Sequence, residues 1–306
     1  MKAVRIHEFG GPEVMHLEDL PTPDPGFGEI LVEIHASSVN PVDYKIRNGV
    51  YLGADKLPLT LGRDIAGEVC HCGPGVTRFR GGEAIYAMLP PERGGFAECV
   101  SVPTEVCAVK PARLDWIQAA AVPLAALTAW QGLFDHGGLA ASQRVLIHGA
   151  SGGVGHFAVQ FAVARGARVI ATCRGEDSDF VHHLGAETVV DYRAEDFRQQ
   201  ASDMDLVFDL VGGETRERSW QTLREGGIMV STLGSPDQAK AAELKVRAVG
   251  FMAQPNGRQL GEIAQLIDEG HVRPYVDRTY PFAASAEAER RLEQEHVRGK
   301  LVLVVD

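Results

Sequence analysis

The segment that most constrains the fold is residues 144–174, RVLIHGASGGVGHFAVQFAVARGARVIATCR, where an apolar run, a glycine-rich turn, a helical pattern and a second apolar run follow one another. Val145–Ile147 is a short apolar run with β-branched residues and predicts a strand, and His156–Ala164 has helical periodicity. The turn between them contains Gly152, Gly153 and Gly155. This order is typical of a dinucleotide-binding βαβ unit, and an ordinary tight turn in an α/β protein is the alternative.

The glycines of this turn predict a phosphate site made of backbone atoms. The motif is Ala150-x-Gly152-x-x-Gly155, with alanine in the first position, where glycine is usual. Residues without a Cβ atom let the backbone approach a pyrophosphate at the helix N-terminus, where the helix dipole favours negative charge. Gly155 lets the helix pack tightly on the strand. The expected cofactor contacts in the turn are Ser151, Gly152, Gly153 and Val154.

The end of the second strand indicates which dinucleotide binds. NAD sites usually carry Asp or Glu there for the ribose 2′-hydroxyl, whereas NADP sites need cations and donors for a 2′-phosphate. This strand ends in Ala171-Thr172-Cys173-Arg174 and contains no acid. Arg174 can form charge-assisted bonds to phosphate, and Tyr192, after the next strand, adds a hydroxyl. We therefore predict an NADPH site with Thr172, Arg174 and Tyr192; a solvated surface charge is the alternative for Arg174.

Composition excludes several classes of protein. The 306 residues are 45% hydrophobic and 23% charged, which is typical of a soluble globular protein. The formal charge of −11 argues against nucleic acid or an anionic membrane as main partner. The sequence has no run of roughly 18 apolar residues and no apolar signal-peptide core, so a cytoplasmic location is expected. The five cysteines are expected to be reduced thiols, and Cys70-His71-Cys72 to be part of a strand rather than half of a metal site.

Two kinds of pattern divide the chain. Short strands separated by glycine and proline clusters are predicted at Glu29–His35, Gly67–Cys72, Ala84–Met88 and Ala97–Val102. After about residue 115, a helical stretch at Ile117–Gly132 precedes strands that alternate with helices, at Arg168–Thr172, Thr188–Asp191, Leu206–Leu210, Ile228–Thr232 and Val246–Phe251. A helix at Ala286–Glu295 and a strand at Lys300–Val305 end the chain. We predict a barrel-like domain from residues 1–114 and 272–306, and a doubly wound parallel sheet over 115–271.

Several segments together resemble the zinc-free, quinone oxidoreductase-like branch of the medium-chain dehydrogenase/reductase superfamily. They are Ser38–Lys45 (SVNPVDYK), Gly62–Gly67 (GRDIAG), Pro123–Ala129 (PLAALTA), the turn at 149–155 and His296–Val302 (HVRGKLV). The resemblance spans nearly the whole chain, and it implies a GroES-like β-barrel catalytic domain built from both ends of the chain around a central Rossmann domain.

Zinc-dependent relatives carry a catalytic cysteine at about Asn40 and Gly-His-Glu where this sequence reads Gly62-Arg63-Asp64. Zinc needs thiolate, imidazole or carboxylate ligands, so no metal is expected. The resemblance therefore implies hydride transfer from NADPH to a quinone or an α,β-unsaturated carbonyl compound, with slight preference for the latter because of the Asn-Pro-Val-Asp-x-Lys stretch. Enoyl-thioester reduction and a non-catalytic NADPH-binding role are the alternatives.

Hydride addition to an enone produces an enolate, whose charge hydrogen-bond donors can stabilise. Asn40, Tyr44 and Lys45 are the candidate catalytic residues. Each has a simpler alternative role. Asn40 would cap a turn before Pro41, Tyr44 would be a packing residue, and Lys45 would be a solvated charge.

The resemblance implies further cofactor contacts and an oligomeric state. The contacts are Thr128, Leu233, Gly234, Phe251, Met252 and Lys300. It also implies a homodimer that pairs the sheet edge near Val246–Phe251, which would bury an exposed strand edge. The substrate is expected to be a small molecule.

Overall fold

The computed structural model describes residues 1–305, which divide into two compact units. The first unit comprises residues 1–124, 254–270 and 274–305, and the second comprises residues 125–253 and 271–273. Both ends of the chain therefore build one unit around a central insertion.

The unit boundaries differ from the predicted domain limits of 114/115 and 271/272. Helix α8 (Gly257–Asp268) belongs to the first unit because its apolar residues are buried against the strands there. The Tyr86 hydroxyl donates to the Leu260 carbonyl at 2.6 Å. A Cβ atom at Gly257 would lie 2.3 Å from the Cys107 carbonyl oxygen, so the start of α8 touches the neighbouring backbone.

The first unit contains a large sheet and a small one. Within residues 1–305 the large sheet has seven strands in the order β15-β16-β3-β5-β6-β8, with β7 also paired to β3. Their bounds are β3 (Glu29–Val39), β5 (Asp64–Cys72), β6 (Ala84–Met88), β7 (Cys99–Pro103), β8 (Cys107–Val109), β15 (Val276–Pro281) and β16 (Lys300–Val304). The small sheet has the order β2 (His16–Asp19), β1 (Lys2–Ile6), β4 (Leu59–Thr60).

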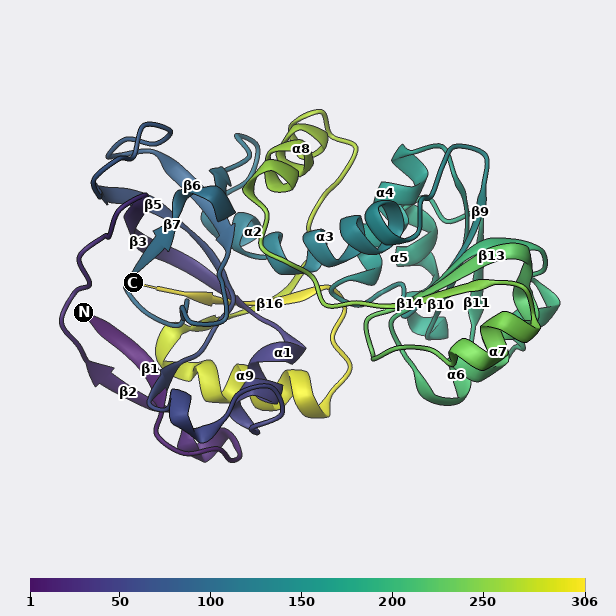
Figure 1. Cartoon of the computed structure of the whole chain (residues 1–306), viewed down its shortest axis with the longest axis horizontal. Helices are drawn as coiled ribbons and strands as arrows, with labels where there is room; N and C mark the ends of the chain where they lie inside the picture. The colour runs from purple at the N-terminus through teal and green to yellow at the C-terminus, as the bar shows by residue number, and fades with distance from the viewer. Residues whose placement is uncertain (306) are drawn as a thin grey trace. The chain divides into compact units, whose positions relative to one another are not determined.

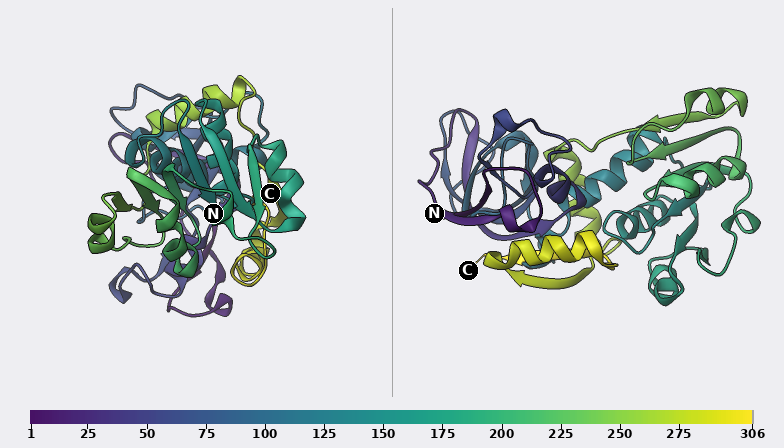
Figure 2. Two further views of the ribbon diagram at one scale, coloured as in Figure 1. Left: turned by 90° about the vertical axis from the view of Figure 1, so that its right-hand side faces the viewer. Right: turned by 90° about the horizontal axis from the view of Figure 1, so that it is seen from below.

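Three helices complete the site-bearing part of the first unit, namely α1 (Pro41–Arg47), α2 (Trp116–Ala120) and α9 (Ser285–Gln294). Helix α1 follows β3 directly, because Asn40 is its N-cap and Pro41 occupies the first turn, where a missing N–H costs no hydrogen bond. Helix α9 contacts α1, and Figures 1 and 2 both show the yellow C-terminal helix beside the purple N-terminal segment. The helix that carries the candidate residues Tyr44 and Lys45 is thus in contact with helix α9 near the C-terminus.

The second unit is a doubly wound parallel sheet, which confirms the predicted fold class. Its six strands have the order β11-β10-β9-β12-β13-β14, and every pair is parallel. The strands are β9 (Arg144–His148), β10 (Arg168–Cys173), β11 (Thr188–Asp191), β12 (Met204–Asp209), β13 (Leu223–Ser231) and β14 (Arg247–Gly250). The helices between these strands are α4 (Gly155–Ala164), α5 (Ser178–His183), α6 (Gly213–Ser219) and α7 (Gln238–Glu243).

The predicted helical stretch Ile117–Gly132 is interrupted. Helix α2 ends at Ala120, and α3 (Pro123–Trp130) begins at Pro123, because proline cannot donate the hydrogen bond that a continuous helix needs. A π-helical turn, Gln131–His136, follows α3.

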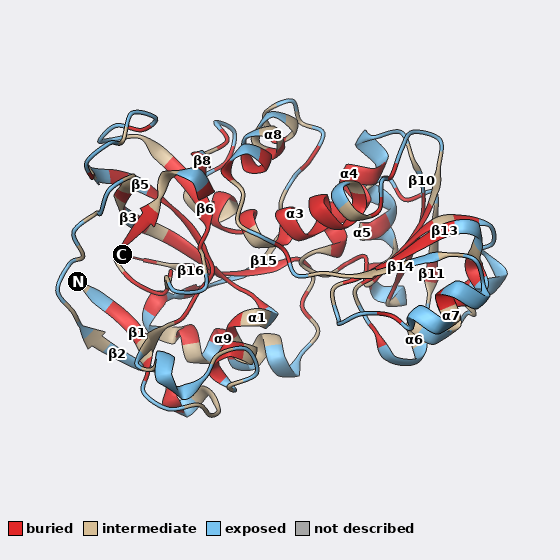
Figure 3. Cartoon of the chain, viewed as in Figure 1, coloured by how far each residue is buried: buried red, intermediate tan, exposed pale blue. Residues whose placement is uncertain are grey.

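Burial follows the layers of the second unit. Figure 3 shows its central strands as mostly buried, whereas α6 and α7 are largely exposed. Strand β14 forms one edge of the sheet, and the homodimer expected there stays a prediction. Over residues 1–305, no helix has the length and apolar character to span a bilayer.

Candidate active site and cofactor site

The glycine turn of the second unit lies between β9 and α4, as predicted. A Cβ atom at Gly155 would lie 2.1 Å from the Gly149 carbonyl oxygen, so only glycine fits there. Gly149 has a φ of +67°, a left-handed conformation that favours glycine. Ser151 is buried, and Gly152, Gly153 and Val154 are partly exposed. Their backbone is therefore accessible at a helix N-terminus, and this geometry fits the pyrophosphate of a dinucleotide.

The predicted phosphate-binding pair is at the carboxyl ends of two neighbouring strands. Arg174 follows β10 and Tyr192 follows β11, and Cys173 is paired with Asp191 in the sheet register. The Arg174 guanidinium donates a side-chain hydrogen bond to Tyr192, which raises the pKa of Arg174 above its usual value. The Arg174 guanidinium also lies 3.5 Å from the Glu176 carboxylate. A cation and a phenol side by side fit a 2′-phosphate.

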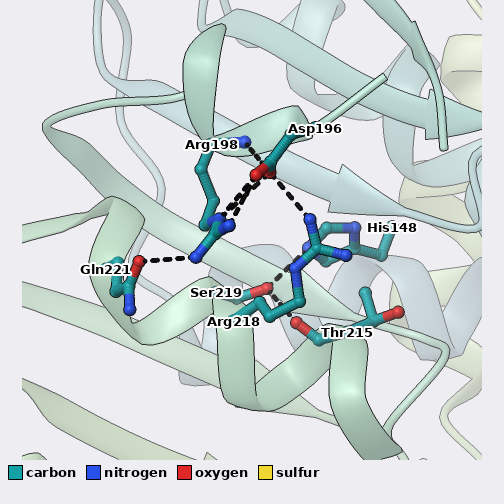
Figure 4. A network of polar contacts seen from close by, with 7 residues as sticks. All are labelled: His148, Asp196, Arg198, Thr215, Arg218, Ser219 and Gln221. Atoms are coloured by element: carbon teal, nitrogen blue, oxygen red, sulfur yellow. Dashed lines mark hydrogen bonds and ion pairs between the residues drawn. The ribbon is translucent and has the colours of Figure 1, made fainter. Parts of the chain in front are cut away.

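The Thr172 hydroxyl is engaged inside the second unit, and the cofactor contact expected of this residue stays a prediction. Thr172 is 2% exposed, and its hydroxyl lies 2.9 Å from Nδ1 of His148. On the other side of the ring, Nε2 lies 2.8 Å from Oγ of Ser219, whose own proton goes to the Thr215 carbonyl at 2.7 Å. The ring must therefore carry its proton on Nε2 and accept from Thr172 at Nδ1. Figure 4 shows His148 and Ser219 in this network.

Burial lowers the pKa of His148 to about 4, and the positive charge of Arg218 adds to this shift. Arg218 donates to Asp196 at 2.8 Å, and Arg198 donates to the same carboxylate. The neutral imidazole thus ties β9, β10 and α6 together. Sequence reasoning missed His148, because a polar residue at the end of a buried strand has no local signal for its partners.

A second buried residue, Asp209, shapes the loops after β12 and β13. Its carboxylate accepts hydrogen bonds from the N–H of Val211 at 3.0 Å, the N–H of Gly212 at 2.7 Å and the hydroxyl of Ser231 at 2.8 Å. The Ser231 hydroxyl in turn accepts from the N–H of Leu233 at 3.1 Å.

The predicted cofactor residues after β13 and β14 lie on these loops or next to them. Arg216 donates to the Leu233 carbonyl at 3.2 Å. Leu233, Gly234 and Met252 are exposed, and the Phe251 ring lies 4.6 Å from the His136 ring. Thr128 is buried in α3. Cofactor contacts by these five residues stay predictions.

The first unit holds the predicted catalytic residues, and Asn40 is the most constrained of them. Its side chain is 1% exposed, and its Nδ2 donates to Asp64 at 2.8 Å and to the Ser38 carbonyl at 3.3 Å. Its Oδ1 accepts from Nζ of Lys300. All of its donors are used inside the unit, so we correct the expectation that Asn40 donates directly to substrate.

Lys300 also differs from its predicted role as a cofactor contact. It is 3% exposed, and Nζ donates to the Val39 carbonyl at 3.0 Å and lies 3.8 Å from Asp64. Asp64 further accepts from the Ser38 hydroxyl at 2.6 Å and the Leu124 N–H at 2.7 Å. Lys300 and Asp64 therefore hold Asn40 in place, and the Lys300 amine makes its contacts within this network.

Tyr44 and Lys45 are the predicted donors that remain accessible. Both are partly exposed on α1. Burial, together with the negative charge of Glu293, raises the pKa of Tyr44, which keeps the phenol protonated as a donor.

Buried charged side chains link α1 to α9. Arg47 is 0% exposed and lies 3.1 Å from the Glu289 carboxylate and 2.9 Å from Glu293, both on α9. Asp43 accepts from the Asn40 N–H at 2.7 Å, and burial raises its pKa to about 7. Burial and the Asp43 charge raise the pKa of Glu289 to about 8.

The residues at the positions of zinc ligands do not fit zinc. An asparagine amide and a guanidinium are not the ligands that zinc selects, and the Asp64 carboxylate is engaged by four protein groups. Across residues 1–305, no group of three or more His, Cys, Asp or Glu side chains is arranged to hold a metal ion.

Comparison with known proteins places the chain in a family. The alcohol dehydrogenase GroES-like domain family matches residues 26–112, and the zinc-binding dehydrogenase family matches residues 184–303. NAD(P)H oxidoreductase RTN4IP1, mitochondrial, from Mus musculus is 34% identical, covering 100% of this chain and 89% of the mouse protein. NADPH-dependent alkenal/one oxidoreductase, chloroplastic, from Arabidopsis thaliana is 32% identical over 99% of this chain and 79% of its own length. Quinone oxidoreductase from Rattus norvegicus is 32% identical, covering 100% of this chain and 98% of the rat protein.

Solved structures agree with these relatives. The quinone oxidoreductase from Coxiella burnetii has a TM-score of 0.92 at 36% identity, covering 100% of this chain and 99% of that one. The Escherichia coli quinone oxidoreductase complexed with NADPH has a TM-score of 0.90 at 28% identity, covering 99% of this chain and 100% of that one. Two relatives carry an organelle in their names, and the cytoplasmic location predicted here stays a prediction. The chain belongs to the medium-chain dehydrogenase/reductase superfamily, in its quinone oxidoreductase and alkenal reductase-like branch, and is an NAD(P)H-dependent oxidoreductase.

Proposed function

We propose that this protein uses NADPH to reduce quinones or α,β-unsaturated carbonyl compounds without zinc. The observation that carries the proposal is the network of Asn40, Asp64 and Lys300, in which the positions of zinc ligands are occupied by groups that bond to one another. Without a Lewis acid to polarise an isolated carbonyl, a substrate already activated by conjugation fits this site best.

The preference for NADPH rests on the second unit. The accessible backbone of the glycine turn would hold the pyrophosphate, and Arg174 with Tyr192 would hold the 2′-phosphate. When bound, NADPH supplies a hydride to the substrate. The relatives' names, which include NADPH-dependent alkenal/one oxidoreductase and quinone oxidoreductase, support both the cofactor and the substrate class.

Residues of the first unit would act on the substrate. The Tyr44 phenol, kept protonated by its raised pKa, would donate a hydrogen bond to the substrate oxygen, and Lys45 would add positive charge nearby. Asn40 would act indirectly, since its side chain holds the end of β3 against Asp64 and Lys300 at the start of α1. Water can supply the proton that completes the reduction.

A screen of NADPH oxidation tests the substrate class. Purified protein is offered quinones, alkenals, cyclic enones and enoyl-thioesters, and we expect turnover with members of the first three groups. Turnover of enoyl-thioesters alone would redirect the proposal to that class, and tight NADPH binding without any turnover would contradict an enzymatic role. Stoichiometric zinc whose removal by a chelator abolishes activity would overturn the metal-free mechanism.

Cofactor preference is tested separately by binding. We expect NADPH to bind much more tightly than NADH, and Arg174→Ala to reduce this difference. Lys245→Ala is the matched control, because it also removes one positive charge but lies before β14, at the opposite edge of the parallel sheet. Equal affinities of the unsubstituted protein for the two cofactors would refute the assignment.

A further inference from the structure

We propose that the Arg63 guanidinium binds the carbonyl oxygen of the substrate and stabilises the negative charge that develops on it. This inference rests on the proposed reduction of conjugated carbonyl compounds. Arg63 lies between Gly62 and the start of β5, and it is 6% exposed. In the sequence, Arg63 stands where zinc-dependent relatives carry a ligand, and the motif assigns it no role of its own.

The first support is that Arg63 is the one buried cationic side chain in the described part of the chain that has no carboxylate partner. Within residues 1–305, the buried cationic side chains are Arg47, Arg63 and Lys300. Arg47 lies 3.1 Å from Glu289, and Lys300 lies 3.8 Å from Asp64. Arg63 has no carboxylate within 4.0 Å in the described part of the chain. Since a buried charge is costly unless it is paired, an unpaired guanidinium indicates that an anionic group from outside completes the site.

The second support is that the side chain is fixed but not saturated. Nε of Arg63 donates to the Leu89 carbonyl at 2.8 Å, and the Leu89 N–H donates to the Arg63 carbonyl at 2.7 Å. No other hydrogen bond of this guanidinium occurs in residues 1–305, although the group has five N–H donors. The two terminal nitrogens of Arg63 have no hydrogen-bond partner among the described residues, yet they are not fully enclosed by protein atoms. They therefore border accessible space. A rigid stem with free terminal donors is what oxyanion stabilisation requires.

The third support is the electrostatic setting. The negative charges that act on Arg63 come from Asp43 on α1, from Asp64 beside it on β5, and from Glu92. Asp43 lies on α1, the helix that also carries Tyr44 and Lys45. Asp64 is engaged by Lys300 and by three hydrogen-bond donors, and Asp43 by the Asn40 N–H, so neither carboxylate neutralises the guanidinium by direct contact.

The chemistry needs a donor where Arg63 offers one. Hydride addition to the β-carbon of an enone forms a C–H bond and moves the C=C electron pair toward the carbonyl, whose oxygen becomes an enolate oxygen. Arg63 donates two N–H groups to this oxygen, and water then protonates the α-carbon to give the saturated carbonyl compound and hydroxide. With a quinone, the same addition gives a hydroquinone monoanion, which water protonates on oxygen. The guanidinium stays protonated throughout and supplies charge without moving a proton.

Kinetics of Arg63→Ala test the inference. We expect kcat/KM for an accepted enone to fall about a hundredfold, the effect of losing an oxyanion donor, while the Kd for NADPH is unchanged. Guanidinium ion at millimolar concentration should restore part of the activity, a response that loss of folding would not show. Arg78→Ala is the matched control, because Arg78 is an exposed arginine of the same unit.

The remaining outcomes distinguish a failure of the role of Arg63 from a failure of the proposed function. A kcat/KM within threefold of the unsubstituted protein, or no rescue by guanidinium, would overturn the role of Arg63. Arg63→Lys, which keeps a cation, should fold and retain intermediate activity; if both variants fail to fold, Arg63 is structural and the inference is wrong. Lack of turnover by the unsubstituted protein on every quinone and enone would instead refute the proposed function itself.

Discussion

His148 should make the second unit sensitive to acid. The ring is fully buried and neutral in the folded protein, with a pKa lowered from 6.5 to about 4. Between these values the unfolded chain binds a proton that the folded chain does not bind, so stability falls as pH falls. At 1.36 kcal/mol per pKa unit, the loss reaches about 2 kcal/mol by about pH 5 and about 3 kcal/mol by about pH 4. This stability is fully present above pH 6.5.

The assay compares the unsubstituted protein with His148→Gln by urea unfolding from about pH 7.5 to about pH 5. At neutral pH the variant is less stable, because Thr172 and Ser219 lose their partner. The difference in unfolding free energy between the two proteins should shrink by about 2 kcal/mol toward pH 5, since glutamine does not titrate. His71→Gln, which replaces an exposed histidine, should leave the pH dependence unchanged.

The readout must report on the second unit alone. Trp130 and Trp220 lie in that unit and Trp116 in the first, so a Trp116→Phe background restricts tryptophan fluorescence to the second unit. Parallel stability curves for the two proteins over this pH range would refute the reasoning. Titration of the His148 ring in the folded protein near pH 6.5, observed by NMR, would refute it directly.

Three other substitutions have defined outcomes. Gly155→Ala should abolish NADPH binding and cost about 1–3 kcal/mol of stability, because its Cβ atom would meet the Gly149 carbonyl oxygen; calorimetry showing normal binding would contradict this. Arg47→Met should cost about 3 kcal/mol at neutral pH and more in alkali, because Glu289 remains buried without its partner; denaturant unfolding at two pH values measures both effects. Arg174→Ala should weaken NADPH binding about tenfold or more while NADH binding stays constant, as titrations of cofactor fluorescence would show.

Local patterns predicted most of the fold. Strands Thr188–Asp191 and Ala84–Met88 have the predicted bounds, and α4 begins one residue before its prediction, at Gly155. These elements carry their own signals, namely β-branched runs and a glycine turn. Strand β3 continues to Val39, beyond the predicted end at His35, because the alternation of residues stops where both faces are buried.

The partners of polar residues were less predictable. Asn40, Asp64 and Lys300 are far apart in the sequence, and only the pairing of β16 with β3 brings Lys300 to Asn40. The same holds for Arg47 and Glu289, which meet through the contact of α1 with α9. Motif reasoning identified positions that matter, but it could not distinguish a donor aimed at a ligand from one used internally, since that depends on long-range geometry.

The pairing of β16 with β3 has a consequence for biosynthesis. Leu301–Val304 are the register partners of Ala36–Val39, so the growing polypeptide lacks one neighbour of β3 until residues 301–304 have left the ribosome. The second unit, whose strands and helices are contiguous apart from residues 271–273, can fold earlier. The first unit must meanwhile keep an unpaired apolar strand edge from aggregating. Folding is therefore not strictly N-terminal first, and translation that stops before residue 300 would leave both this edge and the Asn40 network unfinished.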